Sequence, residues 1–276
     1  MQSASQSLRI LIVAAVLCGL WSVVRIQLPK PELAETNYTA NRMRIERFLE
    51  GPKPKCLIVG TSIAGRLLPS YFKGSGLENI VNLSLDGASP ITGLQLTLGQ
   101  PKTPDLVLLE AHRLWNPVRA NDHQLLALSQ GMDRRLHSEV TLTKADSRPT
   151  TVLYGWLKSH QHQEGGQVTE AKGPVNPSGV LKTVPRPEEL IRAVHELEAR
   201  GTKVVMIRLP VGRENPVDPK GQDDVDLLVK DLGLPTIDLY RQSLEWAEPI
   251  RYSDGLHLAP ESARRLACAL ALQAKR

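Results

Sequence analysis

A serine at the end of an apolar run, and an aspartate and a histidine near the C-terminus, have the types and order of a nucleophilic site. Ser62 follows the run CLIVG at 56–60, and Asp254 and His257 stand three positions apart in YSDGLHL at 252–258. An imidazole can take the proton of a serine hydroxyl, and a carboxylate can hold that imidazole in the tautomer that does so. These residue types predict acyl transfer through a covalent serine intermediate.

Each of these residues also has a simpler structural interpretation. Ser62 could cap a following helix, because a serine hydroxyl accepts a hydrogen bond from the first free N–H groups of a helix. Asp254 and His257 could form a surface turn before the last helix. A serine after the first strand, together with an Asp-x-x-His loop before the last helix, is more specific than either alone. The combination therefore favours a nucleophilic site.

The elements that must position these residues alternate between short apolar strands and amphipathic helices. The sequence predicts strands at 55–60, 80–85, 105–110, 204–209 and 236–239. It predicts helices at 41–50, 63–72, 90–98, 187–200, 223–232 and 260–273. Fully apolar strands separated by helices indicate a parallel sheet that is covered on both faces. Because active sites of such sheets form beyond the carboxyl ends of the strands, Ser62 would stand where a site is expected.

The composition is that of a folded globular protein with a mildly basic surface. Hydrophobic residues make up 41% of the 276 residues and charged residues 23%, and the net charge of +5 is not gathered into a basic run. Because no recognition motif accompanies this charge, no nucleic-acid partner is expected, and an acidic polymer stays open as substrate or neighbour. The three cysteines have no metal-binding spacing, so neither a metal nor another cofactor is predicted, and Cys56 and Cys268 are either buried thiols or a disulfide.

The N-terminus contains an uncharged apolar run at residues 10–24, flanked by Arg9 and Arg25. A helix that spans a bilayer needs about 20 residues, and the stretch 8–28 reaches that length if both arginines extend their charges toward the interfaces. No small-x-small cleavage site follows the run. An uncleaved membrane anchor is therefore preferred to a cleaved signal peptide.

These features divide the chain into three parts. Residues 1–28 are the membrane anchor or signal segment, and residues 29–51 are a proline-rich linker with a short helix. Residues 52–276 are one α/β domain, in which the stretch at about 111–186 breaks the alternation and is predicted to be an insertion of helices and a loop near the site.

With its serine and its Asp-x-x-His loop, the sequence resembles the SGNH/GDSL hydrolase superfamily. The first block of that family, Gly-Asp-Ser, has the form Gly60-Thr61-Ser62 here, and the last block is matched by Asp254 and His257. The resemblance implies a three-layer α/β/α sandwich with a parallel, flavodoxin-like sheet, preceded here by one N-terminal transmembrane helix. It also implies that the serine, histidine and aspartate form a catalytic triad.

The oxyanion-binding blocks of the family are matched only in part. NLSLDGASP at 82–90 resembles the second block, so the resemblance implies an oxyanion hole formed by the backbone N–H groups of Gly87 and Ser62. The third block, Gly-x-Asn-Asp, is not matched after the strand at 105–110, where the candidate substitute donors are His112, Arg113 and Asn116. Losing such a donor typically lowers the rate about a hundredfold or more, which keeps a catalytically weak or inactive domain open.

The anchor and the strand end Arg208-Leu209-Pro210 are similar to those of membrane-anchored bacterial proteins of polysaccharide O-acylation and D-alanylation. Arg208 is then a candidate substrate-binding residue, although an ion pair at the sheet edge would also explain it. The resemblance covers about 52–110 and 187–273 of the chain.

What this second resemblance implies is an exported serine esterase or O-acyltransferase that acts on acyl esters, with cell-surface polysaccharide as a substrate. The protein would be held at a bacterial cytoplasmic membrane by one span, with the catalytic domain in the periplasm or outside the cell. A membrane protein would act as its acyl-transfer partner. The alternative is a non-catalytic domain of the same fold that binds polysaccharide or a membrane partner.

Overall fold

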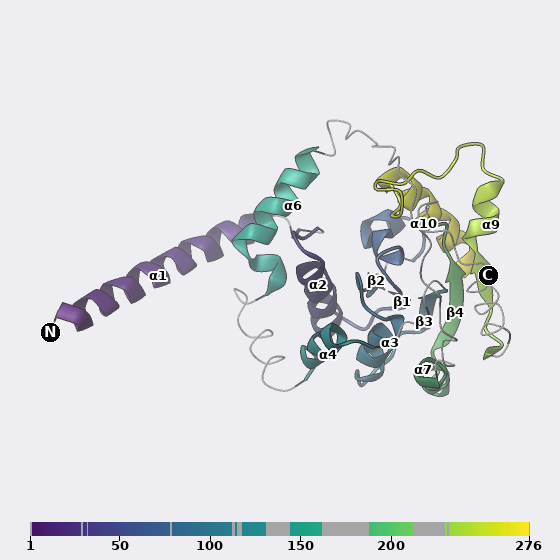
Figure 1. Ribbon diagram of the computed structural model, residues 1–276, viewed down its shortest axis with the longest axis horizontal. Coiled ribbons are helices and arrows are strands. Elements are labelled where there is room, and N and C mark those ends of the chain that lie inside the picture. The colour runs from purple at the N-terminus through teal and green to yellow at the C-terminus, as the bar shows by residue number, and fades with distance from the viewer. Residues whose placement is uncertain are drawn as a thin grey trace, which may run out of the picture.

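Five parallel strands form the sheet that organises the chain (Figure 1). They are β1 (Cys56–Val59), β2 (Ile80–Asn82), β3 (Leu106–Glu110), β4 (Lys203–Arg208) and β5 (Thr236–Asp238). Their spatial order is β2-β1-β3-β4-β5, and every neighbouring pair is parallel, as in flavodoxin-like sheets. This computed structural model describes residues 2–28, 30–31, 33–77, 79–111, 114, 118–130, 144–161, 188–211, 230 and 232–275.

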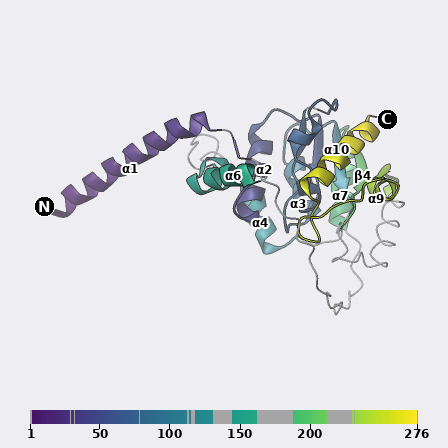
Figure 2. The same cartoon turned by 90° about the horizontal axis from the view of Figure 1, so that it is seen from above.

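Two apolar cores cover the two faces of this sheet. Because successive side chains of a strand point to opposite faces, Leu57 and Val59 enter one core while Ile58 enters the other. The first core is closed by α2 (Asn37–Glu50), α3 (Pro90–Leu98), α4 (Ala120–Ala127) and α7 (Glu188–Ala199). The second is closed by the 3-10 turns η1 (Ala64–Arg66) and η2 (Pro69–Phe72) and by α9 (Leu239–Leu244) and α10 (Pro260–Ala274). The predicted three-layer α/β/α sandwich is confirmed (Figures 1 and 2).

The predicted helix at 63–72 is wrong, since this stretch forms the two short turns η1 and η2 instead. The proline ring of Pro69 restricts the residue before it to extended backbone, and Leu68 has φ −64° and ψ 141°. The Asn82 side chain donates hydrogen bonds of 2.8 Å to the carbonyl oxygens of both Ala64 and Leu67, which take these bonds in place of helical ones. Ser62 therefore does not precede an α-helix, and the alternative in which it caps one does not hold.

The N-terminal segment is one helix, α1 (Gln2–Gln27), of which Gln6–Gln27 is long and apolar enough to cross a membrane. The next helix, α2, begins at Asn37, before its predicted start at residue 41, because the Thr36 hydroxyl accepts a hydrogen bond from the backbone N–H of Thr39 at 3.1 Å. The linker between the two helices packs against the domain, since the Arg47 guanidinium donates to the carbonyl oxygen of Pro31.

The predicted insertion at 111–186 contributes α4, the 3-10 turn η4 (Ala145–Ser147) and α6 (Pro149–Gln161) to the described part of the chain. Helix α4 adds Leu125 to the first core, whereas η4 lies against α2, where the Glu46 carboxylate accepts the backbone N–H of Ala145 at 2.8 Å. Most of the predicted helix at 223–232 lies outside the described residues.

The cysteines at 56 and 268 are both free thiols and form no disulfide, so the prediction of buried thiols holds for Cys56 and is wrong on burial for Cys268. Only Cys56 is buried, and Cys268 is exposed on α10. Burial raises the pKa of the Cys56 thiol to about 12, because the apolar core disfavours the charged thiolate. Cys56 should therefore be unreactive in the folded protein.

Candidate active site

The turn that carries Ser62 is fastened by a buried carboxyl group from the neighbouring strand. Glu110 ends β3 and is fully buried, and its Oε2 accepts the backbone N–H of Thr61 at 2.6 Å and of Ala64 at 3.4 Å. The Thr61 hydroxyl donates to the same oxygen at 3.1 Å. A side chain at position 60 would place its Cβ 2.3 Å from that oxygen, so only glycine fits there. The Glu110 carboxyl group thus binds the backbone on both sides of Ser62.

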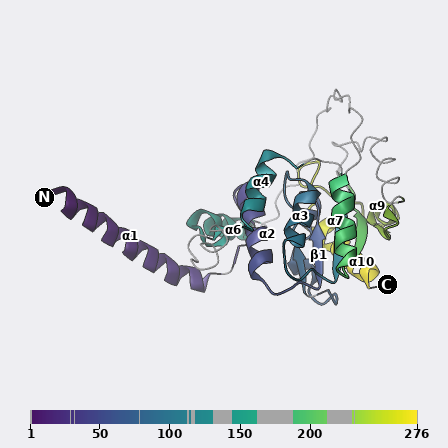
Figure 3. The same cartoon turned by 90° about the horizontal axis from the view of Figure 1, so that it is seen from below.

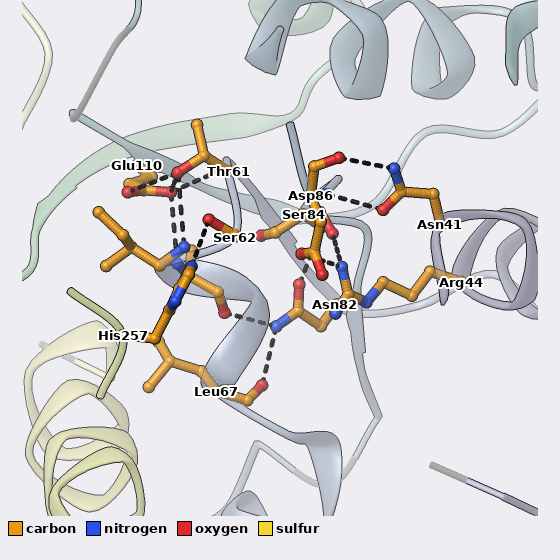
Figure 4. A network of polar contacts seen from close by, with 12 residues as sticks. Asn41, Arg44, Thr61, Ser62, Leu67, Asn82, Ser84, Asp86, Glu110 and His257 are labelled. Atoms are coloured by element: carbon orange, nitrogen blue, oxygen red, sulfur yellow. Dashed lines mark hydrogen bonds and ion pairs between the residues drawn. The ribbon is translucent and has the colours of Figure 1, made fainter. Parts of the chain in front are cut away.

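The structure brings the serine, the histidine and the aspartate together in series (Figure 4). The Ser62 Oγ lies 2.8 Å from Nε2 of His257, and Nδ1 of the same ring lies 2.6 Å from Oδ2 of Asp254. Ser62 comes from the carboxyl end of β1, whereas the other two come from the loop before α10. One ring therefore connects a hydroxyl to a carboxylate, which is the arrangement in which imidazole acts as a general base.

The loop that delivers Asp254 and His257 is held by its own backbone. Tyr252 and Leu258 form an antiparallel bridge, and the backbone N–H of Ser253 donates to the carbonyl oxygen of His257 at 2.8 Å. The other carboxylate oxygen of Asp254, Oδ1, accepts the backbone N–H of His257 at 2.7 Å and of Leu256 at 3.1 Å. Both carboxylate oxygens are thereby occupied, and the imidazole ring has a fixed partner.

The electrostatics of the loop favour an ionised Asp254. Burial by itself would raise the pKa of this carboxyl group, but hydrogen bonds from the backbone and ring of His257 and from the backbone of Leu256, with the charge that His257 can carry, lower it below its ordinary value. An ionised carboxylate accepts the Nδ1 proton of the ring. Nε2 is then left with a lone pair directed at the Ser62 hydroxyl.

A second polar network holds the loop between β2 and α3, which carries the predicted oxyanion donor Gly87. The loop is tied to the serine turn by the backbone N–H of Leu85, which donates to the carbonyl oxygen of Gly60 at 3.0 Å. Gly87 is exposed and has φ +73°, a conformation that side-chain-bearing residues rarely adopt. The position needs glycine for its backbone, and the role of its N–H as an oxyanion donor stays a prediction.

Helix α2 also binds this loop, through the side chains of Asn41 and Arg44 (Figure 4). Asn41 donates through Nδ2 to the carbonyl oxygen of Asp86 at 2.9 Å, and its Oδ1 accepts the backbone N–H of Asp86 at 2.7 Å. Arg44, one turn further along α2, pairs with the Asp86 carboxylate at 2.7 Å and donates to the carbonyl oxygen of Ser84 at 2.6 Å. The residue before Gly87 is thus held through its backbone and its side chain.

The remaining predicted site residues have different outcomes. The candidate substitute donors His112, Arg113 and Asn116 lie outside the described residues. Arg208 ends β4 and forms an ion pair of 3.6 Å with Asp238, its register partner on β5. The ion-pair interpretation of Arg208 is therefore observed, and its role toward a substrate stays a prediction.

Sequence reasoning missed Glu110, Asn82, Asn41, Arg44 and Asp86 as supports of the site. One signal could have pointed to Glu110, since a carboxylate that closes the apolar run LVLL must find partners inside the protein. The side chain of Asn41 is directed by a contact 45 residues away, and no local pattern predicts such a contact.

Replacing Glu110 with leucine is expected to lower the free energy of unfolding by about 2–4 kcal/mol, because each buried N–H that loses its acceptor costs about 1–3 kcal/mol. Glu110→Gln keeps an acceptor oxygen and should cost only about 1 kcal/mol. Thermal unfolding of the two variants and the parent chain in the same detergent measures this difference. Equal stability of Glu110→Leu and the parent would contradict the support assigned to this carboxyl group.

No protein-family model matches the sequence, and no curated protein matches it. Among solved structures it is similar to a "putative acylhydrolase" from Bacteroides fragilis, with 15% identity and a TM-score of 0.43 over 87% of this chain and 97% of that one. It is also similar to a GDSL-like lipase from Bacteroides thetaiotaomicron, with 12% identity and a TM-score of 0.41 over 86% of this chain and 97% of that one.

Proposed function

We propose that the protein is a serine ester hydrolase or O-acyltransferase that uses Ser62 as its nucleophile. The observation that carries this proposal is the pair of consecutive short contacts, 2.8 Å from the serine hydroxyl to the histidine and 2.6 Å from the histidine to the aspartate. His257 acts first as general base and then as general acid, and Asp254 orients its ring.

The first half of the reaction forms an acyl-enzyme. The Ser62 Oγ attacks the carbonyl carbon of an ester while its proton moves to Nε2 of His257, and negative charge develops on the carbonyl oxygen. The backbone N–H groups of Ser62 and Gly87 are the proposed donors to that oxygen. The ester C–O bond then breaks, and the departing alcohol takes the proton from His257.

The second half decides between hydrolysis and transfer. His257 takes a proton from water or from a sugar hydroxyl, whose oxygen attacks the acyl carbon, and the Ser62 oxygen leaves with the proton that His257 returns. Both outcomes use the same residues, so the acceptor that reaches the acyl-enzyme determines the product. A hydroxyl-rich polysaccharide at the membrane surface is the acceptor that the proposed location favours, and a membrane protein would supply the acyl group.

The proposed location rests on α1. Its apolar stretch Gln6–Gln27 has the length of a membrane span, and its side chains at 6–20 are exposed, whereas Arg25 near its end is buried. We place the protein as a single-pass protein of a bacterial cytoplasmic membrane, with the α/β domain in the periplasm or outside the cell.

An acceptor competition experiment tests the proposed chemistry. The full chain in detergent is incubated with p-nitrophenyl acetate, with and without a soluble oligosaccharide, and both acetate release and sugar acetylation are measured. Turnover is expected, and acetyl transfer to the sugar at the expense of free acetate would assign the transferase. Absence of both products with well-folded protein would overturn the proposal and leave a polysaccharide-binding or partner-binding domain.

A further inference from the structure

Helix α6 exposes three large apolar side chains on one of its faces. Leu153, Trp156 and Leu157 are 56%, 49% and 45% exposed, and their spacing of three and four residues puts them on the same side of the helix. On the opposite side Thr151 is buried. An amphipathic helix that turns its apolar side outward has an interaction surface.

The end of α1 is docked directly beside this helix. The indole N–H of Trp21 donates to the carbonyl oxygen of Ser147 at 2.7 Å, and Arg25 lies 3.8 Å from the carboxylate of Asp146. Ser147 is the last residue of η4, which leads into α6 at Pro149. Arg25 was predicted to extend its charge toward the membrane interface, but it pairs with Asp146 of the domain instead. The C-terminal end of α1 is therefore held against the domain.

The linker after α1 packs against α6 as well. A Cβ at position 155 would lie 2.7 Å from the Cβ of Pro31, so Gly155 allows a close approach of the two segments. The Glu35 carboxylate accepts hydrogen bonds from the hydroxyls of Thr150 and Thr151, at 3.2 and 3.3 Å. Figure 1 shows α6 running obliquely past the C-terminal end of α1, and in Figures 2 and 3 it lies beside that end.

We propose that the exposed face of α6, formed by Leu153, Trp156 and Leu157, inserts into the interfacial region of the same bilayer that α1 spans. This inference rests on the membrane placement under the proposed function. Because the end of α1 is docked on η4, directly before α6, the exposed face of α6 lies near the domain-side end of the span, which favours lipid over a separate protein as the occupant.

The side chains of α6 are of types that suit the interfacial region of a bilayer. Tryptophan is enriched where hydrocarbon meets headgroups, because its ring is apolar and its N–H is polar. Helices that lie in the interface combine such apolar residues with basic residues on their other sides, and Lys158 stands 5.9 Å from the centre of the Tyr154 ring. Two contacts with the bilayer, through α1 and α6, would fix the orientation of the domain on the membrane.

A spin-label experiment on the full chain tests this inference. The exposed thiols Cys18 and Cys268 are replaced by serine, whereas Cys56 can stay because it is buried and its pKa is raised to about 12. A nitroxide is then attached through Leu157→Cys, or through Leu272→Cys as a matched control. Leu272 is 67% exposed on α10. A third sample retains Cys18 in place of either new cysteine and reports on α1.

The samples are reconstituted into vesicles of phosphatidylcholine and phosphatidylglycerol. Collisions of each label with oxygen, which concentrates in lipid, and with a water-soluble nickel chelate are measured. The label at 157 is expected to collide with the chelate several-fold less than the label at 272, and more with oxygen. The label at Cys18 should show the same lipid-like behaviour.

Three other results would overturn the inference. If the label at 157 meets the chelate as freely as the label at 272 while Cys18 lies in lipid, α6 does not insert and the anchor stands. If the label at 157 is shielded from both reagents, a second protein copy covers α6. If Cys18 meets the chelate, the membrane placement fails together with the inference, whereas the ester chemistry is measured separately and is unaffected.

Discussion

Replacing Ser62 with alanine is expected to lower kcat on p-nitrophenyl acetate by roughly a millionfold, because removal of a serine nucleophile eliminates the covalent route. The fold should be unchanged, since the hydrogen bond described for the hydroxyl is the one to His257. What remains, about 10³–10⁴ above the uncatalysed rate, would come from substrate binding and from the oxyanion donors.

The matched control is Ser70→Ala, which removes another serine hydroxyl on the same side of the sheet, in η2. Ser70 is half-buried in η2, outside the contacts that join Ser62, His257 and Asp254, so its replacement should retain the rate of the parent chain within about twofold. Initial rates are measured at equal concentrations of folded protein, judged from thermal unfolding. Comparable turnover by Ser62→Ala and Ser70→Ala would rule out Ser62 as the nucleophile.

Replacing Asp254 with asparagine is expected to lower kcat by about ten-thousandfold at neutral pH. The asparagine oxygen would keep the backbone hydrogen bonds from Leu256 and His257, so its NH₂ group would face Nδ1 of the ring. Nδ1 must then be the acceptor, and the ring proton moves to Nε2. An Nε2 that already carries a proton cannot take one from Ser62.

The same variant separates this effect from loss of structure. The folded pKa of Asp254 is lowered, so the stabilisation it provides is fully present above the ordinary carboxyl pKa of about 3.9 and is lost as the pH falls through the lower folded value. Near neutral pH Asp254→Asn lacks this stabilisation, which is small because the Asp254 side chain is 52% exposed, so the variant should unfold at a slightly lower temperature than the parent chain but remain folded, and thermal unfolding checks this. A folded Asp254→Asn with a rate near that of the parent would contradict the orienting role.

The sheet and the three central residues could be predicted because their signals are local or topological. Apolar strands separated by helices leave few alternatives to a parallel sheet, and the carboxyl ends of such strands meet on one edge. Ser62 follows the first strand and His257 precedes the last helix, so both were expected at that edge. The structure places them 2.8 Å apart.

The supports of the site could not be predicted because they depend on contacts between distant residues. The turn after Ser62 was expected to be helical from its apolar spacing, but Asn82, from the next strand, binds the carbonyl groups that a helix would use. Glu110 interacts with a backbone 49 residues earlier. Local propensity contains no information on either contact, so tertiary hydrogen bonds override it.

The central claim is that Ser62 is a nucleophile activated by His257 and Asp254, and covalent labelling tests it most directly. The full chain is treated with a fluorophosphonate at mildly alkaline pH, digested and analysed by mass spectrometry. We predict one phosphonylated residue, Ser62, with a new Oγ–P bond and loss of fluoride, and much slower labelling in His257→Ala. A folded chain that stays unlabelled, or is labelled at another residue, would contradict the claim.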